Sequence, residues 1–406
     1  MSDSLLRYQQ DIRRFSDELI RIQAPIKILD SIKWPRQVED DFLAKQSKEL
    51  PNVSNDFYQS IPLSFNADQT QTDLQGLKNA VERGLGKRDK LGKILLANID
   101  QYRIVIDMLH NRGKPMFGKL SQELYGSASD KLHGDRHTVR QLGDRLSHIF
   151  SLPAARHMSS RHPKIVTAPE AVTILSERLV KYFHNDEIHV KLSDGIVSDA
   201  AVGGDTVKLN TRAMFSESDL NVYEVHEGWV HVGTTLNGRA QPHATWLSVG
   251  SPRVTASQEG LAVLMEMLTL SSNPGRARRI SDRVSAVDMA EQGADFIEVY
   301  RYFRNLNLSS KDSYRVTQRV FRGGMVGGGS FFTGLPELIP MLFLGKLAIE
   351  DIPVLYQAYQ EGIIAHPKYL PPMFEDISGL YAWFGFASGI GNIDLKGVQR
   401  HFARQF

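Results

Sequence analysis

The sequence contains, just past its midpoint, the stretch His226-Glu227-Gly228-Trp229-Val230-His231. Two imidazoles on one helix, with a glutamate directly after the first, are a common way to present a zinc ion and a general base. Histidine supplies a neutral ligand, and a glutamate that does not bind the metal can take a proton from water. Because the chain has 13 histidines, a chance pair of unrelated helix histidines is the alternative at this point.

The two histidines lie five residues apart, which is not the usual helical spacing. Histidines four residues apart share one face of an α-helix, whereas a spacing of five turns the second about 140° away from the first. A bulge of the i→i+5 kind would bring both rings to one face, and such bulges concentrate at functional sites. We therefore predict a π-type turn at 226–231, with Gly228 easing the distortion.

A second motif begins the next predicted helix and reads Gln258-Glu259-Gly260-Leu261-Ala262. Glu259 follows His231 by 28 residues. A glutamate from a following helix is a common third zinc ligand and leaves the fourth position for water. By itself Glu259 is only an acid in a first helical turn, where the helix dipole favours it. Taken together, the two motifs predict a zinc site made of His226, His231 and Glu259, with Glu227 as the general base.

The segments around these motifs predict an α+β fold that is predominantly helical. Pro169 starts a predicted helix through Phe183, and Ser216–Asp219 form a capping box for a helix that ends near Asn237-Gly238. Two short extended segments at 188–192 and 206–210 lie between these helices, with turn signals that predict a hairpin-like pair. The helix of the second motif runs from about Thr255 to Thr269.

The first part of the chain reads as helical. Apolar spacing predicts helices at 4–22, 72–109 and 136–150, and the polar stretch 157–164 follows. We therefore predict an N-terminal helical region at 1–160 and a zinc metallopeptidase-like domain at 161–406, within a chain long enough for two or three packed units.

Composition excludes several classes of protein. The chain has 406 residues, no cysteine and a net charge of +2, so disulfides, thiolate nucleophiles and Cys-bound zinc are ruled out. This balance of charge predicts neither a nucleic-acid partner nor a membrane partner. The basic run at 275–279 is interpreted as a solvated loop. The polar N-terminus lacks a signal-peptide pattern, and the apolar stretch 335–347 is shorter than the ~20 residues of a spanning helix, so the expected location is cytoplasmic.

At these residues the chain resembles a known family. The stretch 258–262 is the signature of the QEGLA-motif proteins, which in bacteria are labelled flavohemoglobin expression-modulating. The same domain is found in the microtubule-associated tyrosine carboxypeptidases, which remove a C-terminal tyrosine from tubulin and carry a His-Glu-x-x-x-His helix followed by a glutamate about thirty residues later. Further similar stretches are 123–126, 203–209, 234–238, 319–324 and 327–333, so the likeness covers most of the chain beyond about residue 60.

The resemblance implies a zincin-like metallopeptidase domain and a carboxypeptidase that acts on a peptide or protein C-terminal tail. In it, His226, His231 and Glu259 would hold the zinc and Glu227 would be the base. Arg322, with Arg319 as a competitor, is a candidate for binding the terminal carboxylate, because a guanidinium pairs with it in bidentate fashion. The segment 206–210, with Lys208, is a candidate for binding the substrate backbone as an added strand.

Other assignments stay open from the sequence. The residues Tyr300, Tyr302 and Tyr314 are unranked candidates for stabilising an oxyanion, and His243 is a candidate for orienting the substrate. Two further functions remain as alternatives. One is a zinc amidase or hydrolase that acts on a non-peptide substrate, and the other is a regulatory or binding protein without catalysis. The chain has no recognisable DNA-binding motif and no basic stripe, which disfavours direct transcriptional control.

Overall fold

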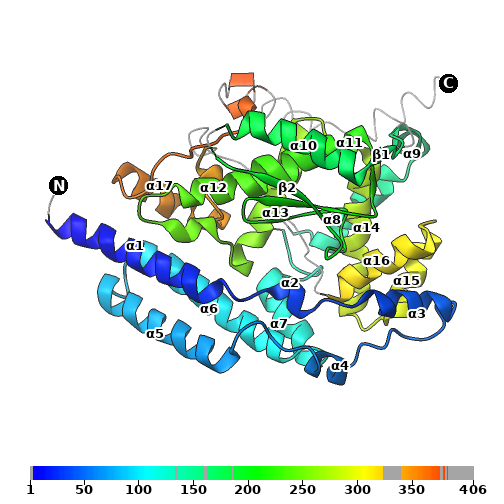
Figure 1. Ribbon diagram of the computed structural model, residues 1–406, viewed down its shortest axis with the longest axis horizontal. Coiled ribbons are helices and arrows are strands. Elements are labelled where there is room, and N and C mark those ends of the chain that lie inside the picture. The colour runs from blue at the N-terminus through cyan, green and yellow to red at the C-terminus, as the bar shows by residue number, and fades with distance from the viewer. Residues whose placement is uncertain are drawn as a thin grey trace.

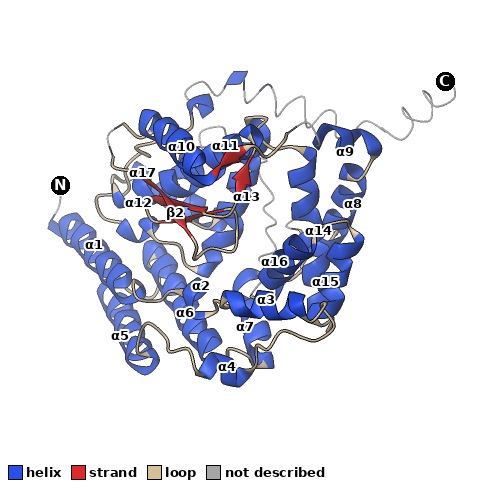
Figure 2. Cartoon of the chain, turned by 45° about the vertical axis from the view of Figure 1, so that its right-hand side comes forward, coloured by secondary structure: helices blue, strands red, loops and turns tan. Residues whose placement is uncertain are grey.

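The computed structural model describes residues 3–132, 136–159, 162–184, 186–322, 340–374, 378–379 and 382. Within that part the protein is predominantly helical with two small β-sheets, which confirms the predicted α+β class (Figures 1 and 2). None of the helices in the described part combines the length and apolarity that crossing a membrane requires.

Most of the elements along the described chain are helices, and the strands are short. Those before residue 160 are the helices α1 (Asp3–Gln23), α2 (Ile28–Ser31), α3 (Arg36–Ala44), α4 (Asn55–Gln59), α5 (Ala67–Leu85), α6 (Lys90–His110), α7 (Pro115–Tyr125), α8 (Val139–Phe150) and α9 (Pro153–Ser159). The later helices are α10 (Ala168–Tyr182), α11 (Glu217–Tyr223), α12 (Gly233–Arg239), α13 (Thr255–Leu268), α14 (Pro274–Glu291), α15 (Phe296–Asn305), α16 (Ser310–Phe321) and α17 (Ile352–Gln360). The strands are β1 (Val166–Thr167), β2 (His189–Ser193), β3 (Ala200–Gly203), β4 (Thr206–Asn210) and β5 (Met214–Phe215). A π-helix forms η1 (Glu224–Val232), and short 3-10 turns form η2 (Thr245–Ser248), η3 (Pro252–Val254), η5 (Pro340–Phe343), η6 (Ile349–Asp351) and η7 (Pro372–Phe374).

The long helix predicted at 72–109 is wrong, because two helices occupy this part of the chain. The first, α5, stops at Gly86, whose φ of +85° favours glycine and ends a helix. The second, α6, starts at Asp89, whose side chain accepts a hydrogen bond from the Gly92 N–H at 2.6 Å. Gly86 and Asp89 are helix stop and start signals that the apolar spacing alone did not reveal.

The larger sheet has the strand order β2-β4-β3. The predicted hairpin between 188–192 and 206–210 is wrong, because β2 and β4 pair in parallel. The tight turn belongs instead to β3 and β4, which pair antiparallel through Gly203–Thr206 and turn at Gly204, where φ is +65°. Since β4 is bonded on both sides, β3 and β2 are the edges of this sheet.

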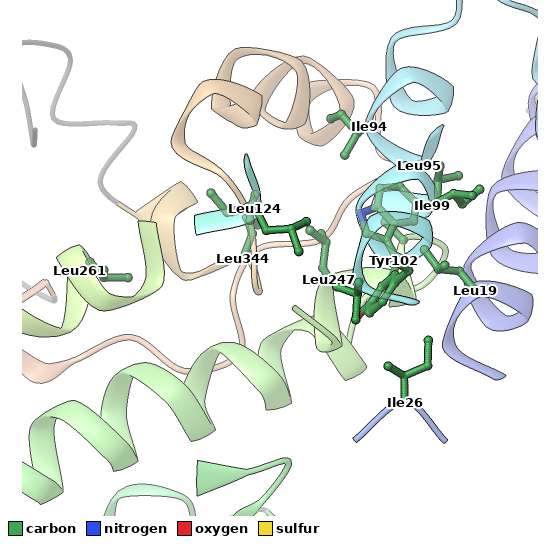
Figure 3. Packing of buried hydrophobic residues seen from close by; sticks show 14 of the residues in the cluster. Leu19, Ile26, Ile94, Leu95, Ile99, Tyr102, Leu124, Leu247, Leu261 and Leu344 are labelled. Atoms are coloured by element: carbon green, nitrogen blue, oxygen red, sulfur yellow. The ribbon is translucent and has the colours of Figure 1, made fainter. Parts of the chain in front are cut away.

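The largest hydrophobic core joins the N-terminal helices to the helices around the histidine motif. Figure 3 shows Leu19 of α1 and Leu95 of α6 in one cluster with Leu247 and Leu261. Tyr102 of α6 belongs to this cluster, and its hydroxyl donates to the Gly250 carbonyl at 3.0 Å. The boundary near residue 160 stays a prediction, and this core runs across it.

A further layer of helices flanks this core and contributes residues of α15 and α16 to it. It contains α8, α14, α15 and α16, which gather at the right of Figure 2. Helix α8 lies against α14, where the Ser147 hydroxyl donates to Asp282 at 2.6 Å and Arg140 pairs with Asp288 at 2.9 Å. These contacts hold α14 in place against α8.

Candidate metal centre

The histidine motif lies on the π-helix η1, which confirms the π-type turn predicted at 226–231. A π-helix closes its hydrogen bonds over five residues, so side chains five apart come to the same face. The rings of His226 and His231 accordingly lie together in an edge-to-face arrangement, with centroids 4.8 Å apart and an interplanar angle of 81°. The capping box predicted at Ser216–Asp219 is also present and opens α11, which leads into η1.

Packing on both sides holds η1 in place. Val230 belongs to the core shared with the N-terminal helices, and Val232 belongs to a second core built on α10 and the larger sheet. Gly228 lies directly against α10, where an added Cβ would come within 2.3 Å of Leu179 Cδ2. Gly228 therefore allows α10 to approach the metal helix closely, whatever it contributes to the helical distortion.

The three predicted ligands come together from two helices. His231 Nε2 lies 3.4 Å from Glu259 Oε1, and His226 Nε2 lies 3.7 Å from Glu259 Oε2. The candidate ligand atoms all lie within 4.8 Å of one another. Ligands about 2.0–2.1 Å from a tetrahedral zinc would be roughly 3.3–3.4 Å apart. The donor set and its spacing therefore fit a zinc ion, and the Glu259 side chain, which is 30% exposed, leaves the site open to solvent on that side.

A buried acid fixes the ring of His226. Glu266 of α13 is fully buried, and its Oε1 lies 2.7 Å from His226 Nδ1. Arg276 donates two hydrogen bonds to the same carboxylate, each at 2.6 Å. Although burial alone would raise the pKa of Glu266, these partners lower it to about 2. With Nδ1 engaged in this way, Nε2 of His226 is directed at Glu259.

Polar contacts also fix the other two ligands. The Thr234 hydroxyl donates to Gln258 Oε1 at 2.9 Å, which ties the residue before Glu259 to the helix after His231. The His231 carbonyl accepts from the Thr235 hydroxyl at 2.8 Å and from Lys346 Nζ at 3.2 Å. Burial lowers the pKa of Lys346 to about 8, although the charges of Glu259 and Glu227 oppose the shift.

Glu227 is the acid of the cluster without an engaged partner. Its residue is only 9% exposed, and among the described residues it makes no hydrogen bond or ion pair. Its negative charge nevertheless acts on three neighbouring groups: it contributes to the raised pKa of His226 and opposes the lowering of the pKa of Arg319 and Lys346 by burial. A carboxylate that is nearly buried and has no partner is suited to exchanging a proton with a bound water or substrate.

Sequence reasoning missed two basic side chains around the site, Arg276 and Arg283. The run at 275–279 is not the solvated loop that we predicted, because it lies in the first turns of α14. Its Arg276 is the guanidinium that binds Glu266. Arg283, two turns later on α14, and Arg319 of α16 both interact electrostatically with Glu259.

The predicted substrate-binding residues lie in different parts of the structure. Arg319 lies in the charge cluster of the site, whereas Arg322 donates to the Leu29 carbonyl at 2.7 Å, away from it. Lys208 is exposed, and its neighbours Val207 and Leu209 point the other way into the core. The added strand predicted at 206–210 is wrong, because β4 is already paired on both sides. The edge strand next to η1 is β3.

The remaining candidates contact other parts of the molecule. Tyr300 and Tyr314 pack against Phe42, and Tyr302 packs against Phe303 in the core of α14–α16. His243 follows α12 and lies against α1, because its backbone carbonyl accepts a hydrogen bond from the Ser16 hydroxyl at 3.0 Å. Burial and the positive charge of Arg13 both lower the pKa of its imidazole. The similar stretches at 323–324 and 327–333 lie outside the described residues.

Comparison with known proteins agrees with the motif. No curated protein gives a significant match to the chain. The sequence profile of the family described as microtubule-associated tyrosine carboxypeptidase matches residues 40–334 and 332–392, which together cover most of the chain. These matches include both helices of the candidate metal centre. The chain therefore belongs to the microtubule-associated tyrosine carboxypeptidase family.

Proposed function

We propose that this protein is a zinc-dependent carboxypeptidase that removes the C-terminal residue from a peptide or protein tail. The observation that supports this most directly is the meeting of His226, His231 and Glu259, whose ligand atoms lie within 4.8 Å of one another. Beside them lies Glu227, which makes no hydrogen bond or ion pair within the described part of the chain. A purely structural zinc site fills its fourth position with another protein ligand. Among the described residues, this site offers three candidate ligands and one acid without a partner, which is the set of groups that a catalytic zinc site uses.

The family supports the class of reaction. Membership implies a carboxypeptidase-type enzyme, and tyrosine is therefore the first C-terminal residue to test. The helical ligand pair, the downstream glutamate and the small sheet next to the metal helix are also compatible with a zincin-like catalytic domain, which is part of this proposal.

The residues of the chain divide the work of hydrolysis. When bound, zinc would polarise the scissile carbonyl and lower the pKa of water. Glu227 would take a proton from the attacking water, whose oxygen bonds to the carbonyl carbon. It would then deliver that proton to the nitrogen of the departing residue as the C–N bond breaks. Glu266 and Arg276 would hold His226 in the orientation and tautomer that present Nε2.

The experiment is a metal and product analysis on four proteins. Elemental analysis should find about one zinc per chain in the wild type and in Glu227→Gln, and little in His226→Ala. Glu177→Gln is the matched control for Glu227→Gln, because Glu177 is an exposed glutamate of α10. Mass spectrometry should show loss of the C-terminal tyrosine from a peptide with the wild type and the control, and no loss with Glu227→Gln.

Two outcomes would contradict the proposal. The first is the absence of zinc from the wild type even after zinc is added. The second is a fully zinc-loaded wild type that releases no C-terminal residue from peptides with any of the twenty residues at that position, which would favour the binding-protein alternative.

A further inference from the structure

A basic pocket lies where the loop after α3 meets helices α15 and α16, which lie close together in Figures 1 and 2. Its volume is about 560 Å³. Among the described residues that line it, four are cationic and none is acidic; the cations are Lys48, Arg301, Arg304 and Lys311. No residue of the candidate metal centre is among them, so this basic pocket is a separate site.

Three segments of the chain bring these cations together. Arg301 and Arg304 lie three residues apart and hence on one face of α15. Lys311 is in the first turn of α16, which packs against both α15 and α3. Lys48 lies in the loop after α3, where a φ of +56° at Gln46 turns the chain back. The basic pocket is therefore formed by tertiary packing and not by one local run of charge.

The cations of the basic pocket have no acidic partners. Lys48, Arg301 and Lys311 make no ion pair within the described part of the chain. Arg304 donates a hydrogen bond to the Leu308 carbonyl and likewise makes no ion pair there. Like charges gathered around one concavity repel one another, so an anion that binds between them gains from all four.

The acids next to these cations in the sequence are engaged elsewhere. The Glu49 carboxylate, next to Lys48, lies 2.5 Å from Lys45 Nζ. The Asp312 carboxylate, next to Lys311, accepts a hydrogen bond from the Ser309 hydroxyl at 2.6 Å. Neither acid lines the basic pocket, so its positive charge is left for a ligand.

A buried tyrosine adds a hydroxyl without a partner. Tyr300 lines the basic pocket and is 5% exposed, and its ring packs edge-on against Phe42 with centroids 5.1 Å apart. Its hydroxyl makes no hydrogen bond to any residue that the structure describes. Because a buried polar group without a hydrogen bond is costly, a ligand that accepts from this hydroxyl would satisfy it.

The donors of the basic pocket fit phosphoryl oxygens. Guanidinium groups pair with phosphate in bidentate fashion, and lysine binds it as a point charge. Ser310, which also lines the basic pocket, begins α16, and the N–H groups of a first helical turn favour the same anion. A phosphoryl group carries about −1.5 to −2 charge at pH 7, so two of them match four cations. Matching them with carboxylates would take about four side chains.

We propose that the basic pocket binds a small molecule with two linked phosphoryl groups, which is either inorganic pyrophosphate or the diphosphate of a nucleotide. Its volume lies within the range of about 300–1,000 Å³ that is usual for small-molecule sites. Arg301 and Lys311 bind the phosphoryl oxygens, and the Tyr300 hydroxyl donates to one of them. Leu43, which also lines the basic pocket, offers an apolar contact to the organic part of a nucleotide. This binding site is additional to the proposed function and does not depend on it.

The test is isothermal titration calorimetry with pyrophosphate, ADP and orthophosphate as probes. Pyrophosphate also chelates zinc, so the full chain carries His226→Ala, which removes a candidate metal ligand. The buffer contains about 0.15 M salt, which screens diffuse attraction between charges. We expect one pyrophosphate or ADP per chain with a dissociation constant below about 1 mM, and orthophosphate at least about 10-fold weaker. Tighter binding of ADP than of pyrophosphate would identify a nucleotide, and equal binding would identify the inorganic ion. The wild type should bind ADP as tightly as His226→Ala does, which keeps the test available if that variant does not fold.

Substitutions separate a built site from general charge attraction. Arg301→Gln and Lys311→Gln should each weaken binding about 10-fold, the usual effect of losing a hydrogen bond to a charged group. Tyr300→Phe keeps the ring and should weaken binding about 5- to 10-fold. Arg7→Gln on α1 and Lys93→Gln on α6 are the matched controls. Both are exposed cations without an ion pair among the described residues, and neither lines the basic pocket, so both variants should bind like the parent protein.

Three results would overturn this inference. The first is the absence of pyrophosphate and ADP binding up to about 1 mM. The second is binding that Arg301→Gln, Lys311→Gln and Tyr300→Phe leave unchanged, or that the two control variants weaken as much. The third is tighter binding of a hexaglutamate peptide than of either diphosphate, which would make the basic pocket a site for an acidic peptide.

Discussion

Glu266 and Arg276 form a two-point ion pair whose carboxylate also contacts His226 Nδ1, so one buried carboxylate joins the candidate ligand His226 to helix α14. Glu266 has no exposed side-chain surface, and Arg276 retains 22%. A carboxylate hydrogen-bonded to a metal-binding histidine fixes the ring and raises its basicity. The pKa of His226 is accordingly raised, although burial alone would lower it.

Removing the Glu266 carboxylate should weaken zinc binding without removing a ligand. We expect Glu266→Gln to lower zinc affinity about 10- to 100-fold, the usual effect of losing such a supporting contact. Competition with a chromophoric chelator on the purified protein measures this affinity. Glu177→Gln, on the exposed side of α10, is the control and should bind zinc like the wild type. Unchanged affinity in Glu266→Gln would show that His226 needs no support from α13.

Removing Arg276 should lower the free energy of unfolding even in the zinc-free protein. Arg276→Met leaves the buried Glu266 carboxylate with His226 as its remaining partner among the described residues, and breaking a buried ion pair in this way costs about 3–5 kcal/mol. Urea unfolding of the zinc-free protein would show the loss, and the double variant Glu266→Gln/Arg276→Met should recover part of it. A loss below about 1 kcal/mol in the single variant would mean that water reaches Glu266.

Two glycines near the metal helix should differ in their tolerance of alanine. At Gly238 a Cβ would lie 2.2 Å from the backbone carbonyl of Leu247, and that backbone cannot move aside easily. At Gly228 the clash is with the end of the Leu179 side chain, at 2.3 Å. Thermal unfolding should therefore show the larger loss for Gly238→Ala. Leu179→Ala should rescue Gly228→Ala and should not rescue Gly238→Ala, and an equal rescue of both would contradict this account.

The sequence predicted the centre of the site better than its surroundings. The five-residue spacing of His226 and His231 predicts a π-helix because no regular helix would bring the two rings together. The role of Arg276 depends on the tertiary contact that its side chain makes with Glu266 of α13, which no local pattern encodes. The position of Glu266 could have been predicted in part, because it lies two helical turns after Glu259 and hence on the same face of the predicted helix.

The errors in the strands and in the long helix have different causes. The parallel pairing of β2 with β4 is set by tertiary packing on α10, and β3 is a short Ala-Ala-Val-Gly segment with weak strand character. The break between α5 and α6, in contrast, has local sequence signals, because Gly86 ends α5 and Asp89 caps the start of α6. An apolar pattern that continues across such a break conceals it, because both helices bury apolar faces in the same core.

The shared core predicts that the N-terminal helices and the metal centre unfold together. Leu95 of α6 is fully buried in the cluster that also contains Val230 of the metal helix. Leu95→Ala should cost about 2–5 kcal/mol, and in urea the midpoint of zinc release should shift together with the loss of helical circular dichroism. Leu29→Ala is the control, because Leu29 is 68% exposed and should shift neither signal. In a shared core, the N-terminal helices cannot unfold while the helix of His226 and His231 stays folded. If zinc release kept its wild-type midpoint in urea while helical circular dichroism was lost earlier, residues 1–160 would therefore be an independent domain.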